Sequence, residues 1–367
     1  MLNEHDYHFM REALALAADG LYTSMPNPRV GCVVVKDSVI VGRGAHLRAG
    51  EPHAEVHALR EAGALARDAD VYVTLEPCSH HGRTPPCADA LMAAGVKRVF
   101  AAMQDPNPRV AGSGLARLQS QGISVSSGLL EAEAKALNPG FISRMSRGRP
   151  YVRSKIAGSL DGRTALANGV SQWITGEEAR ADVQHWRARS CAVLTGMGTV
   201  LLDDPQMNVR DAGLLGLKSG IQPLRVVVDS RLRLSPQARI LHGGHVLVAH
   251  ASQDEARLAA LQSAGADCVH LPAEDGRVDM HKLLQVLASR EINEVLVEAG
   301  QELNGALLQA GLIDEFIFYY APLLLGSDAR GMFDLPAMTA MSQRIDLQLL
   351  SVDRVGVDLR VRASTGA

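Results

Sequence analysis

The sequence of 367 residues predicts two α/β domains in one chain. The chain is longer than the ~100–200 residues of a usual domain. Short apolar runs typical of strands alternate with stretches of helical apolar period, which is the pattern of layered α/β sheets. The basic segment 144–150, which contains Gly and Pro, interrupts this alternation. We therefore expect one domain over 1–147 and a second over 148–367.

The first half predicts one sheet with covering helices. The apolar period of the first twenty residues favours a helix. A helix that begins on Pro and ends on Gly95 shows the usual asymmetry of helix ends. Residues 36–38 have the character of a hairpin turn between two strands. The expected strands are 30–35, 39–42, 71–75, 97–103 and 123–125, and the expected helices are 4–20, about 51–65, 85–95, 113–121 and 131–145.

The second half predicts another sheet, whose end differs from its beginning. Its last apolar stretches follow one another without helices between them, so we expect the final strands to be antiparallel. The expected strands are 151–157, 191–196, 224–229, 245–250, 267–271, 293–298 and 315–326, followed by strand-like stretches near 346–350 and 353–362.

Composition argues against nucleic-acid and membrane partners. Aromatic residues make up 4% of the chain and the net charge is −3, with equal numbers of acidic and basic side chains up to Arg147. A nucleic-acid surface needs basic and aromatic side chains. No stretch reaches the ~20 apolar residues of a membrane span, and the acidic start is unlike a signal peptide. Five scattered cysteines, an odd number, predict a reducing cytoplasm rather than a disulfide framework.

Four residues predict a catalytic zinc site. His53, Cys78 and Cys87 supply the imidazole and thiolate ligands that Zn²⁺ prefers, and three protein ligands leave a position for water. Glu55 follows His53 by two residues, close enough to take a proton from that water without binding the metal. Cys87 is expected in a first helical turn, where the helix dipole favours a thiolate.

Alternatives to this interpretation are a closed structural zinc site and a coincidental cluster. The general zinc-deaminase pattern is His-x-Glu followed by Pro-Cys-x-x-Cys. This chain has His53-Ala54-Glu55 and Pro77-Cys78, but its second cysteine comes nine positions later rather than three. The intervening residues predict a loop that lines the pocket. Four neighbouring histidines could each be mistaken for ligands, and we expect at least two of them to be bystanders: His46, His57, His80 and His81.

The segments PNPRVGCVVV, GAHLRAGEPHAEVHALREAG, VTLEPCSHHGRTPPCADAL and MQDPNPRVAG resemble the bifunctional riboflavin-biosynthesis deaminase/reductase family, and the resemblance covers essentially the whole chain. It implies a cytidine-deaminase-like three-layer α/β domain that binds one zinc and deaminates a diaminopyrimidinone carrying a ribosylamino 5′-phosphate. It also implies a dihydrofolate-reductase-like α/β domain that reduces the ribosyl group to a ribityl chain with NADPH, and a homo-oligomer.

By the same resemblance, Glu55 is the proton donor and four residues lie on the substrate side of the deaminase site: Asn27, His46, His80 and Arg83. Arg83 can hold a phosphate through a bidentate guanidinium contact. It can equally be a solvated loop arginine. Asn27, which lies between two prolines, can equally be a turn residue.

The residues of the second half alone say less about its chemistry. Gly196 and Gly198 begin a glycine turn after a strand, but position 201 is Leu, so the dinucleotide fingerprint Gly-x-Gly-x-x-Gly is incomplete. Gly300 stands between a strand and a helix, where backbone N–H groups suit a phosphate. An ordinary tight turn is the alternative.

The segments 155–165, 171–176, 195–205 and 297–308 resemble the family's reductase domain. Many relatives have Gly-Gly where this chain has Ala299-Gly300, which bears on the approach of the cofactor. Arg187 and Arg210 can hold a phosphate or pair with acids, and Trp173 can be a core residue. The resemblance implies NADPH contacts at Ala157, Trp173, Thr199, Asp203, Ser230, Gly300, Gln301, Glu302, Leu303, Asn304, Gly305 and Ala306, and substrate contacts at Ser171, Arg187, Met207, Arg210 and Glu298.

Two other functions compete with this one. The first is deamination of a different nucleobase by a chain whose second domain is unrelated, although such deaminases typically have the short cysteine spacing. The second is a nucleic-acid-binding module with a structural zinc, which the low charge and few aromatic residues disfavour.

Overall fold

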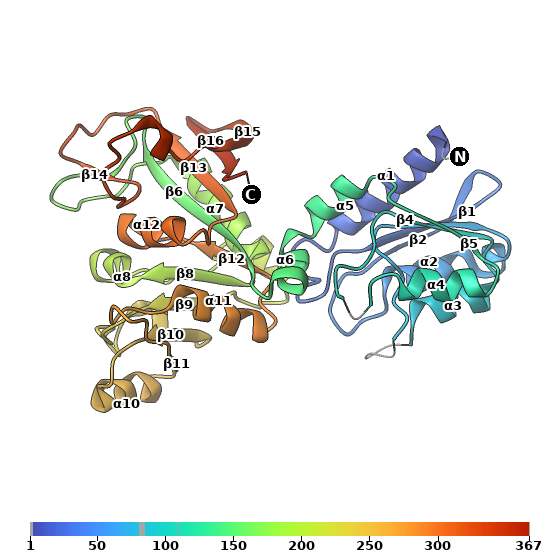
Figure 1. The fold of residues 1–367 in the computed structure, drawn as a ribbon, viewed down its shortest axis with the longest axis horizontal. Helices are drawn as coiled ribbons and strands as arrows, with labels where there is room; N and C mark the ends of the chain where they lie inside the picture. Colours follow the sequence, from blue (N-terminus) through green and yellow to red (C-terminus); the bar gives the residue numbers. More distant parts are fainter. Residues whose placement is uncertain (1–2, 81–84, 109, 367) are drawn as a thin grey trace. The chain divides into compact units, whose positions relative to one another are not determined.

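The computed structural model describes residues 3–80, 85–108 and 110–366 (Figure 1). The chain divides into two compact units, Met1–Arg149 and Pro150–Ala367. The division lies two residues beyond the expected boundary after residue 147. Within the described ranges, no helix is both long enough and apolar enough to cross a membrane.

The first unit is built on a five-stranded sheet of order β2-β1-β3-β4-β5. Strand β1 is antiparallel to β2 and β3, whereas β3, β4 and β5 are parallel. The strands are β1 (Gly31–Lys36), β2 (Val39–Ala45), β3 (Asp70–Val73), β4 (Arg98–Ala101) and β5 (Ser124–Ser127). The helices are α1 (Glu4–Ala18), α2 (Ala54–Ala62), η1 (Gly63–Ala66), α3 (Cys87–Ala94), α4 (Ser113–Ser120), α5 (Glu131–Leu137) and α6 (Pro139–Arg147).

Two glycines allow helices to lie very close to the two faces of this sheet. A Cβ on Gly31 would come within 1.9 Å of the Ala13 carbonyl oxygen in α1, and one on Gly44 within 2.0 Å of the Ala54 carbonyl oxygen in α2. Gly44 pairs with Cys32, the neighbour of Gly31. Because successive strand residues point to opposite faces, α1 and α2 cover opposite faces. This gives the three layers expected and fixes the first turn of α2.

The second unit contains a nine-stranded sheet of order β11-β10-β9-β8-β12-β6-β13-β16-β15 and a two-stranded sheet of β14 and β7. In this order, the first seven strands, from β11 through β6 to β13, run parallel to one another. The last two strands, β16 and β15, are each antiparallel to the strand before, as predicted. The strands are β6 (Tyr151–Ser159), β7 (Arg163–Ala165), β8 (Ala192–Gly196), β9 (Leu224–Val228), β10 (Val246–His250), β11 (Asp267–His270), β12 (Glu294–Val297), β13 (Glu315–Ala321), β14 (Arg330–Gly331), β15 (Gln348–Val355) and β16 (Asp358–Ser364).

Helices and short helical turns connect these strands. They are α7 (Glu177–Arg189), α8 (Met197–Asp203), α9 (Ala212–Leu217), η2 (Arg239–Leu241), α10 (Glu255–Ser263), α11 (Met280–Ser289), α12 (Gln301–Gln309) and η3 (Met341–Gln343).

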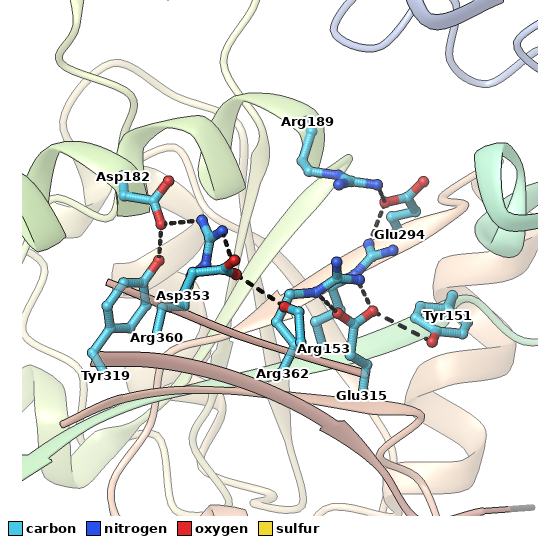
Figure 2. Close-up of polar contacts among 11 residues, drawn as sticks. Tyr151, Arg153, Asp182, Arg189, Glu294, Glu315, Tyr319, Asp353, Arg360 and Arg362 are labelled. Atoms are coloured by element: carbon cyan, nitrogen blue, oxygen red, sulfur yellow. Dashed lines mark hydrogen bonds and ion pairs between the residues drawn. The ribbon is translucent and has the colours of Figure 1, made fainter. Parts of the chain in front are cut away.

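A buried ionic network joins the amino-terminal parts of three central strands (Figure 2). The Arg153 side chain in β6 is 3% exposed and pairs with Glu294 at the start of β12 and Glu315 at the start of β13. Glu315 also pairs with Arg362 of β16 at 2.7 Å. Because each carboxylate has a guanidinium partner, the buried charges are compensated.

Two expected elements differ in the structure. The single helix expected over 131–145 is two helices, α5 and α6, because Asn138 leaves the helical conformation and binds the backbone N–H and carbonyl of Arg29. The expected break between 350 and 353 lies inside β15, and the turn comes instead at Gly356, whose φ of 61° suits glycine.

Candidate active sites

Three side chains of the first unit converge on a point that could hold a metal ion. His53 occupies the position directly before α2, Cys78 lies in the loop after β3, and Cys87 is the first residue of α3. His53 Nδ1 lies 3.2 Å from Cys87 Sγ and 3.6 Å from Cys78 Sγ. The possible ligand atoms of all three lie within 4.8 Å of one another. This donor set fits Zn²⁺, with one tetrahedral position left over.

Hydrogen bonds prepare Cys78 to act as a thiolate. The Cys87 thiol, His53 and the Cys87 backbone N–H all lower the pKa of the Cys78 thiol, against the opposing effect of burial. The backbone contact is a 3.2 Å bond from Cys87 N to Cys78 Sγ. The N-terminus of α3 therefore points at a developing negative charge, which its dipole stabilises.

Glu55 lies beside this cluster in the first turn of α2 and is 3% exposed. Burial, reinforced by the charge of Cys78, raises the pKa of its carboxyl to about 7, against a lowering effect from a hydrogen bond with Cys87. A buried carboxyl that gains and loses a proton near neutral pH can shuttle protons between water and an amine.

Asn27 and His46 meet next to the cluster. Asn27 Nδ2 lies 3.0 Å from His46 Nε2, and His46 Nδ1 lies 3.2 Å from the Pro52 carbonyl oxygen. A carbonyl only accepts, so Nδ1 carries the hydrogen. Burial lowers the pKa of His46. The neutral ring then accepts from the Asn27 side-chain NH₂, so the side-chain oxygen Oδ1 of Asn27 can accept from another donor. The ring of His46 also contacts that of His53, with centroids 5.2 Å apart.

The long cysteine loop is only partly described. His80 is exposed, and Arg83 and His81 lie outside the described residues. Asp105 follows β4, and its carboxyl is half-buried. Burial raises the pKa of this carboxyl, and the charges of His80 and Cys78 also act on it. Sequence reasoning gave Asp105 no role, although it stands in the quoted segment MQDPNPRVAG.

In the second unit, most of the expected residues follow the carboxyl ends of neighbouring parallel strands. Thr199 and Asp203 lie in α8, directly after β8, and Ser230 follows β9. Glu298 and Gly300 follow β12, which pairs with β8. In open parallel sheets, this edge is where ligands bind. Asp203 accepts a 3.2 Å hydrogen bond from Gln172, and Ser230 Oγ accepts one from Val278 N at 3.1 Å.

Arg187 and Glu298 form a buried ion pair at this edge. Arg187 Nε and Nη2 donate to the two carboxylate oxygens of Glu298 at 2.5 and 3.0 Å, and Nη1 donates to the Asn208 carbonyl at 2.9 Å. Burial favours the neutral form of Glu298, but the charge of Arg187 outweighs it and lowers the pKa. Arg210 is exposed and lies close enough for its charge to act on Glu298. Arg210 is thus the more accessible arginine for a phosphate.

Lys155 of β6 lies near this pair. Burial lowers the pKa of its ammonium group, while the charge of Glu298 raises it. Its position beside a buried carboxylate makes it a candidate for orienting a polar substrate. Met207, whose φ is 52°, packs its sulfur 3.7 Å from Arg187 Nη2.

Trp173 is not a core residue, because it is 68% exposed and stacks under the Arg180 guanidinium at 4.7 Å. Its ring is therefore open to a planar ligand. Ser171 is half-buried two residues earlier, and Ala157 is half-buried within β6.

The Gly300 turn presents open backbone at the start of α12. Among the described residues, no atom lies within 4 Å of a Cβ added at Gly300, and no side chain caps the helix. Asn304 holds the turn from below, donating to the Ala299 carbonyl at 3.0 Å and accepting from Ser154 Oγ at 3.0 Å. Gly305 lies against the Asp334 backbone. NADPH contacts are expected over residues 300–306, but within this range the side chain of Asn304 is already hydrogen-bonded to other residues of the protein.

Comparisons with known proteins bear on both units. Residues 3–103 match the model of the cytidine and deoxycytidylate deaminase zinc-binding region, and residues 150–361 match that of the RibD C-terminal domain. The chain is 51% identical over 362 residues to the riboflavin biosynthesis protein RibD of Escherichia coli, covering 96% of this chain and 98% of that protein. It is 46% identical over 370 residues to RibD of Haemophilus influenzae, covering 98% and 97%.

Solved structures agree over nearly the whole chain. RibD of Acinetobacter baumannii superposes with a TM-score of 0.90 at 48% identity, covering 98% of this chain and 99% of that one. A diaminohydroxyphosphoribosylaminopyrimidine deaminase/5-amino-6-(5-phosphoribosylamino)uracil reductase of Thermotoga maritima gives a TM-score of 0.86 at 34% identity, covering 98% of each chain.

Proposed function

The chain belongs to the RibD family of riboflavin biosynthesis proteins, and on that premise we propose which substrates it uses and which residues do the work. It is an enzyme with a zinc-dependent deaminase domain and an NADPH-dependent reductase domain. The match over 150–361 disfavours an unrelated second domain. The predicted combination of a cytidine-deaminase-like domain and a RibD reductase domain is confirmed.

We propose that the substrate of the first unit is 2,5-diamino-6-(5-phosphoribosylamino)pyrimidin-4-one. The deaminase/reductase activity named for the Thermotoga maritima relative supports this choice. Water replaces one exocyclic amine, so a C–N bond breaks, a C=O bond forms and ammonia leaves. His53, Cys78 and Cys87 would hold the zinc, which lowers the pKa of bound water.

Glu55 transfers the protons in this proposal. Its buried carboxyl takes a proton from water and delivers it to the departing amine. The side-chain oxygen Oδ1 of Asn27 accepts from an N–H of the pyrimidine, and His46 keeps the Asn27 amide in that orientation. His80 and Arg83 are proposed to serve the phosphate end of the substrate.

In the second unit we propose that NADPH lies along the carboxyl edge of the parallel strands. The open backbone at Gly300 and in the first turn of α12 suits a phosphate. The backbone at Gly198 is similarly open, because among the described residues no atom lies within 4 Å of a Cβ added there. Exposed Trp173, together with Ala157, Thr199, Asp203 and Ser230, would complete the contact. NADPH supplies the hydride that converts the ribosyl group of the deaminated product to ribityl.

The substrate of this second step would lie against Arg187 and Glu298. We propose that Arg210 holds its phosphate, because the Arg187 guanidinium is already bonded to Glu298 and Asn208. Met207 lies against Arg187. We propose that Ser171 also contacts the substrate and that Lys155 orients the ribose.

A stoichiometric assay tests this function. The purified zinc-loaded chain, given the diaminopyrimidine phosphate and NADPH, should release one ammonia and oxidise one NADPH for each substrate consumed. NADPH oxidation should follow ammonia release. A zinc-loaded chain with an intact Glu55 that releases no ammonia from this substrate would contradict the proposal.

We propose that the chain forms a homo-oligomer through strand β15. This strand lies at the edge of the nine-stranded sheet and exposes Leu349 (65%), Leu350 (46%) and Val352 (57%). An unpaired apolar edge strand favours pairing with another chain. Light scattering at micromolar concentration should give a dimer or larger, and a Leu349→Lys, Val352→Lys variant should dissociate. A monomeric wild type would contradict this proposal.

We also propose that the enzyme works in the cytoplasm. None of the five cysteines, all of them among the described residues, forms a disulfide, and two of them belong to the metal cluster, which a disulfide would destroy. Cell fractionation with activity assays checks this placement, and activity outside the cytoplasmic fraction would contradict it.

A further inference from the structure

A buried carboxylate with no role in the proposed chemistry lies in the loop that carries the second zinc ligand. Glu76 is 3% exposed, and its side chain accepts hydrogen bonds from four backbone N–H groups. Oε1 accepts from Gly114 at 2.8 Å and Leu115 at 3.3 Å. Oε2 accepts from Gly112 at 2.9 Å and Asp105 at 3.1 Å. Both oxygens are therefore fully engaged.

These contacts fasten two segments, the start of α4 and the loop that precedes it. The first turn of α4, which begins at Ser113, has backbone N–H groups without intrahelical acceptors. A carboxylate at this end is favoured by the helix dipole. Asp105 follows β4, and its backbone N–H is one of the four donors to Glu76. One side chain thus anchors both the loop and the helix to the residue pair Glu76-Pro77.

Cys78 lies between residues that contact the same helix. A Cβ on Gly114 would come within 1.9 Å of the Pro77 carbonyl oxygen, so α4 rests directly on that peptide. On the other side of Cys78, Ser79 Oγ lies 2.7 Å from Ser113 Oγ. The position of the Cys78 backbone is therefore coupled to the position of α4.

We propose that Glu76 is a positioning residue of the deaminase site, which holds Cys78 at the distance from His53 and Cys87 that zinc requires. The inference rests on the proposed zinc site. This role requires a carboxylate at position 76, because each oxygen of Glu76 accepts from two N–H donors. In Glu76→Gln, the amide NH₂ must oppose one pair of donors, so even this isosteric change breaks the arrangement.

The test compares Glu76→Gln with Glu131→Gln, which changes an exposed glutamate whose side chain pairs with Lys135. In the metal-free protein, amide hydrogen exchange at Gly114 and Leu115 should be at least about tenfold faster in Glu76→Gln. Zinc transfer to a chelator should be about 10–100-fold faster, as for outer-shell changes at metal sites. The visible spectrum of the Co²⁺-substituted protein should shift. Deaminase kcat should fall about tenfold or more with a smaller change in KM, while reductase activity stays at the wild-type rate.

Unchanged exchange, zinc release and Co²⁺ spectrum in a folded Glu76→Gln chain would overturn the proposal. If that variant does not fold, Arg117→Met tests more gently the coupling of α4 to the segments that carry the ligands. Arg117, whose side chain is 42% exposed, donates from Nη1 to the Ser79 carbonyl at 3.1 Å and pairs with Asp89 of α3 at 2.7 Å. Faster zinc release in Arg117→Met supports the coupling, and wild-type release contradicts it. Failure of the wild type to deaminate the proposed substrate would count against the proposed function and not against the role of Glu76. Amide hydrogen exchange in the metal-free protein would still test that role.

Discussion

The two units use charge in opposite ways. In the first, the reactive groups gather in one small cluster, where His53, Cys78 and Cys87 lie within a few ångströms of each other and Glu55 stands beside them. In the second, the strongest buried charges pair with one another, as in Arg187–Glu298 and the Arg153 network (Figure 2). The comparison teaches that a metal site keeps donor groups available, whereas a cofactor site relies on exposed backbone and on side chains that other residues hold in place.

Removing a metal ligand should produce the largest difference between the units. Cys87→Ala deletes a ligand in the first turn of α3, so zinc should fall from about one per chain to almost none and ammonia release should cease. The reductase should keep its rate. Metal analysis and the two activity assays check this. Cys268→Ala, at a half-buried cysteine of β11, is the matched control and should keep its zinc. A zinc-loaded Cys87→Ala chain would break the comparison.

Breaking the buried ion pair should act only on the second unit. Glu298→Gln leaves the Arg187 guanidinium, 11% exposed, without its charge partner. Breaking such a pair costs about 3–5 kcal/mol of unfolding free energy. The surface pair Arg290–Asp267 is the control, and Asp267→Asn should cost less than about 1 kcal/mol. Urea unfolding of the reductase unit measures both. Equal costs for the two variants would contradict the distinction between buried and surface charge.

Acid should also weaken the second unit. Burial would raise the pKa of Glu315, but Arg153 and Arg362 outweigh it and lower the pKa. Glu298 behaves in the same way. A carboxyl with a lowered folded pKa stabilises the fold above its unfolded pKa of about 4.3, and this contribution is lost as the pH falls through the folded value. Unfolding free energy measured from pH 7 to pH 3 should therefore decline, with a shallower decline in Glu315→Gln. An identical slope in that variant would exclude this origin.

The smallest predicted effect concerns Trp173. Its exposed ring should stack on NADPH, so Trp173→Leu should raise the KM for NADPH about 2- to 10-fold and leave deamination unchanged. Steady-state kinetics of the reductase measures this. The control is Leu324→Ala, since Leu324 is 74% exposed. Should both variants leave that KM unchanged, Trp173 is not a cofactor contact.

The sequence predicts the first unit's cluster because its residues stand at element ends that the sequence itself marks. Pro52 and Pro86 precede the helices that begin at Ala54 and Cys87, so His53 and Cys87 are placed by local signals. Local sequence signals of this kind do not predict the roles of Glu76 and Asp105. Their partners lie about 30–40 positions away, and only the packing of α4 on Pro77 brings them together.

The second unit is predictable in its topology and less so in its site. The alternation of strands and helices and the helix-free end predict parallel strands followed by antiparallel ones, as observed. Arg187 and Glu298 are separated by more than a hundred positions, so no local pattern predicts that they pair. Trp173 shows the same limit, because an aromatic side chain at the surface and one in a core have the same local sequence signal.

The separation of the two chemistries is the central claim, and Glu55→Ala tests it most directly. The variant should retain about one zinc per chain, lose about 10²–10⁴-fold in deamination, and reduce pre-deaminated substrate with NADPH at the wild-type rate. Loss of both activities in a folded, zinc-loaded Glu55→Ala chain would contradict two independent sites, and undiminished ammonia release would remove Glu55 from the proton path.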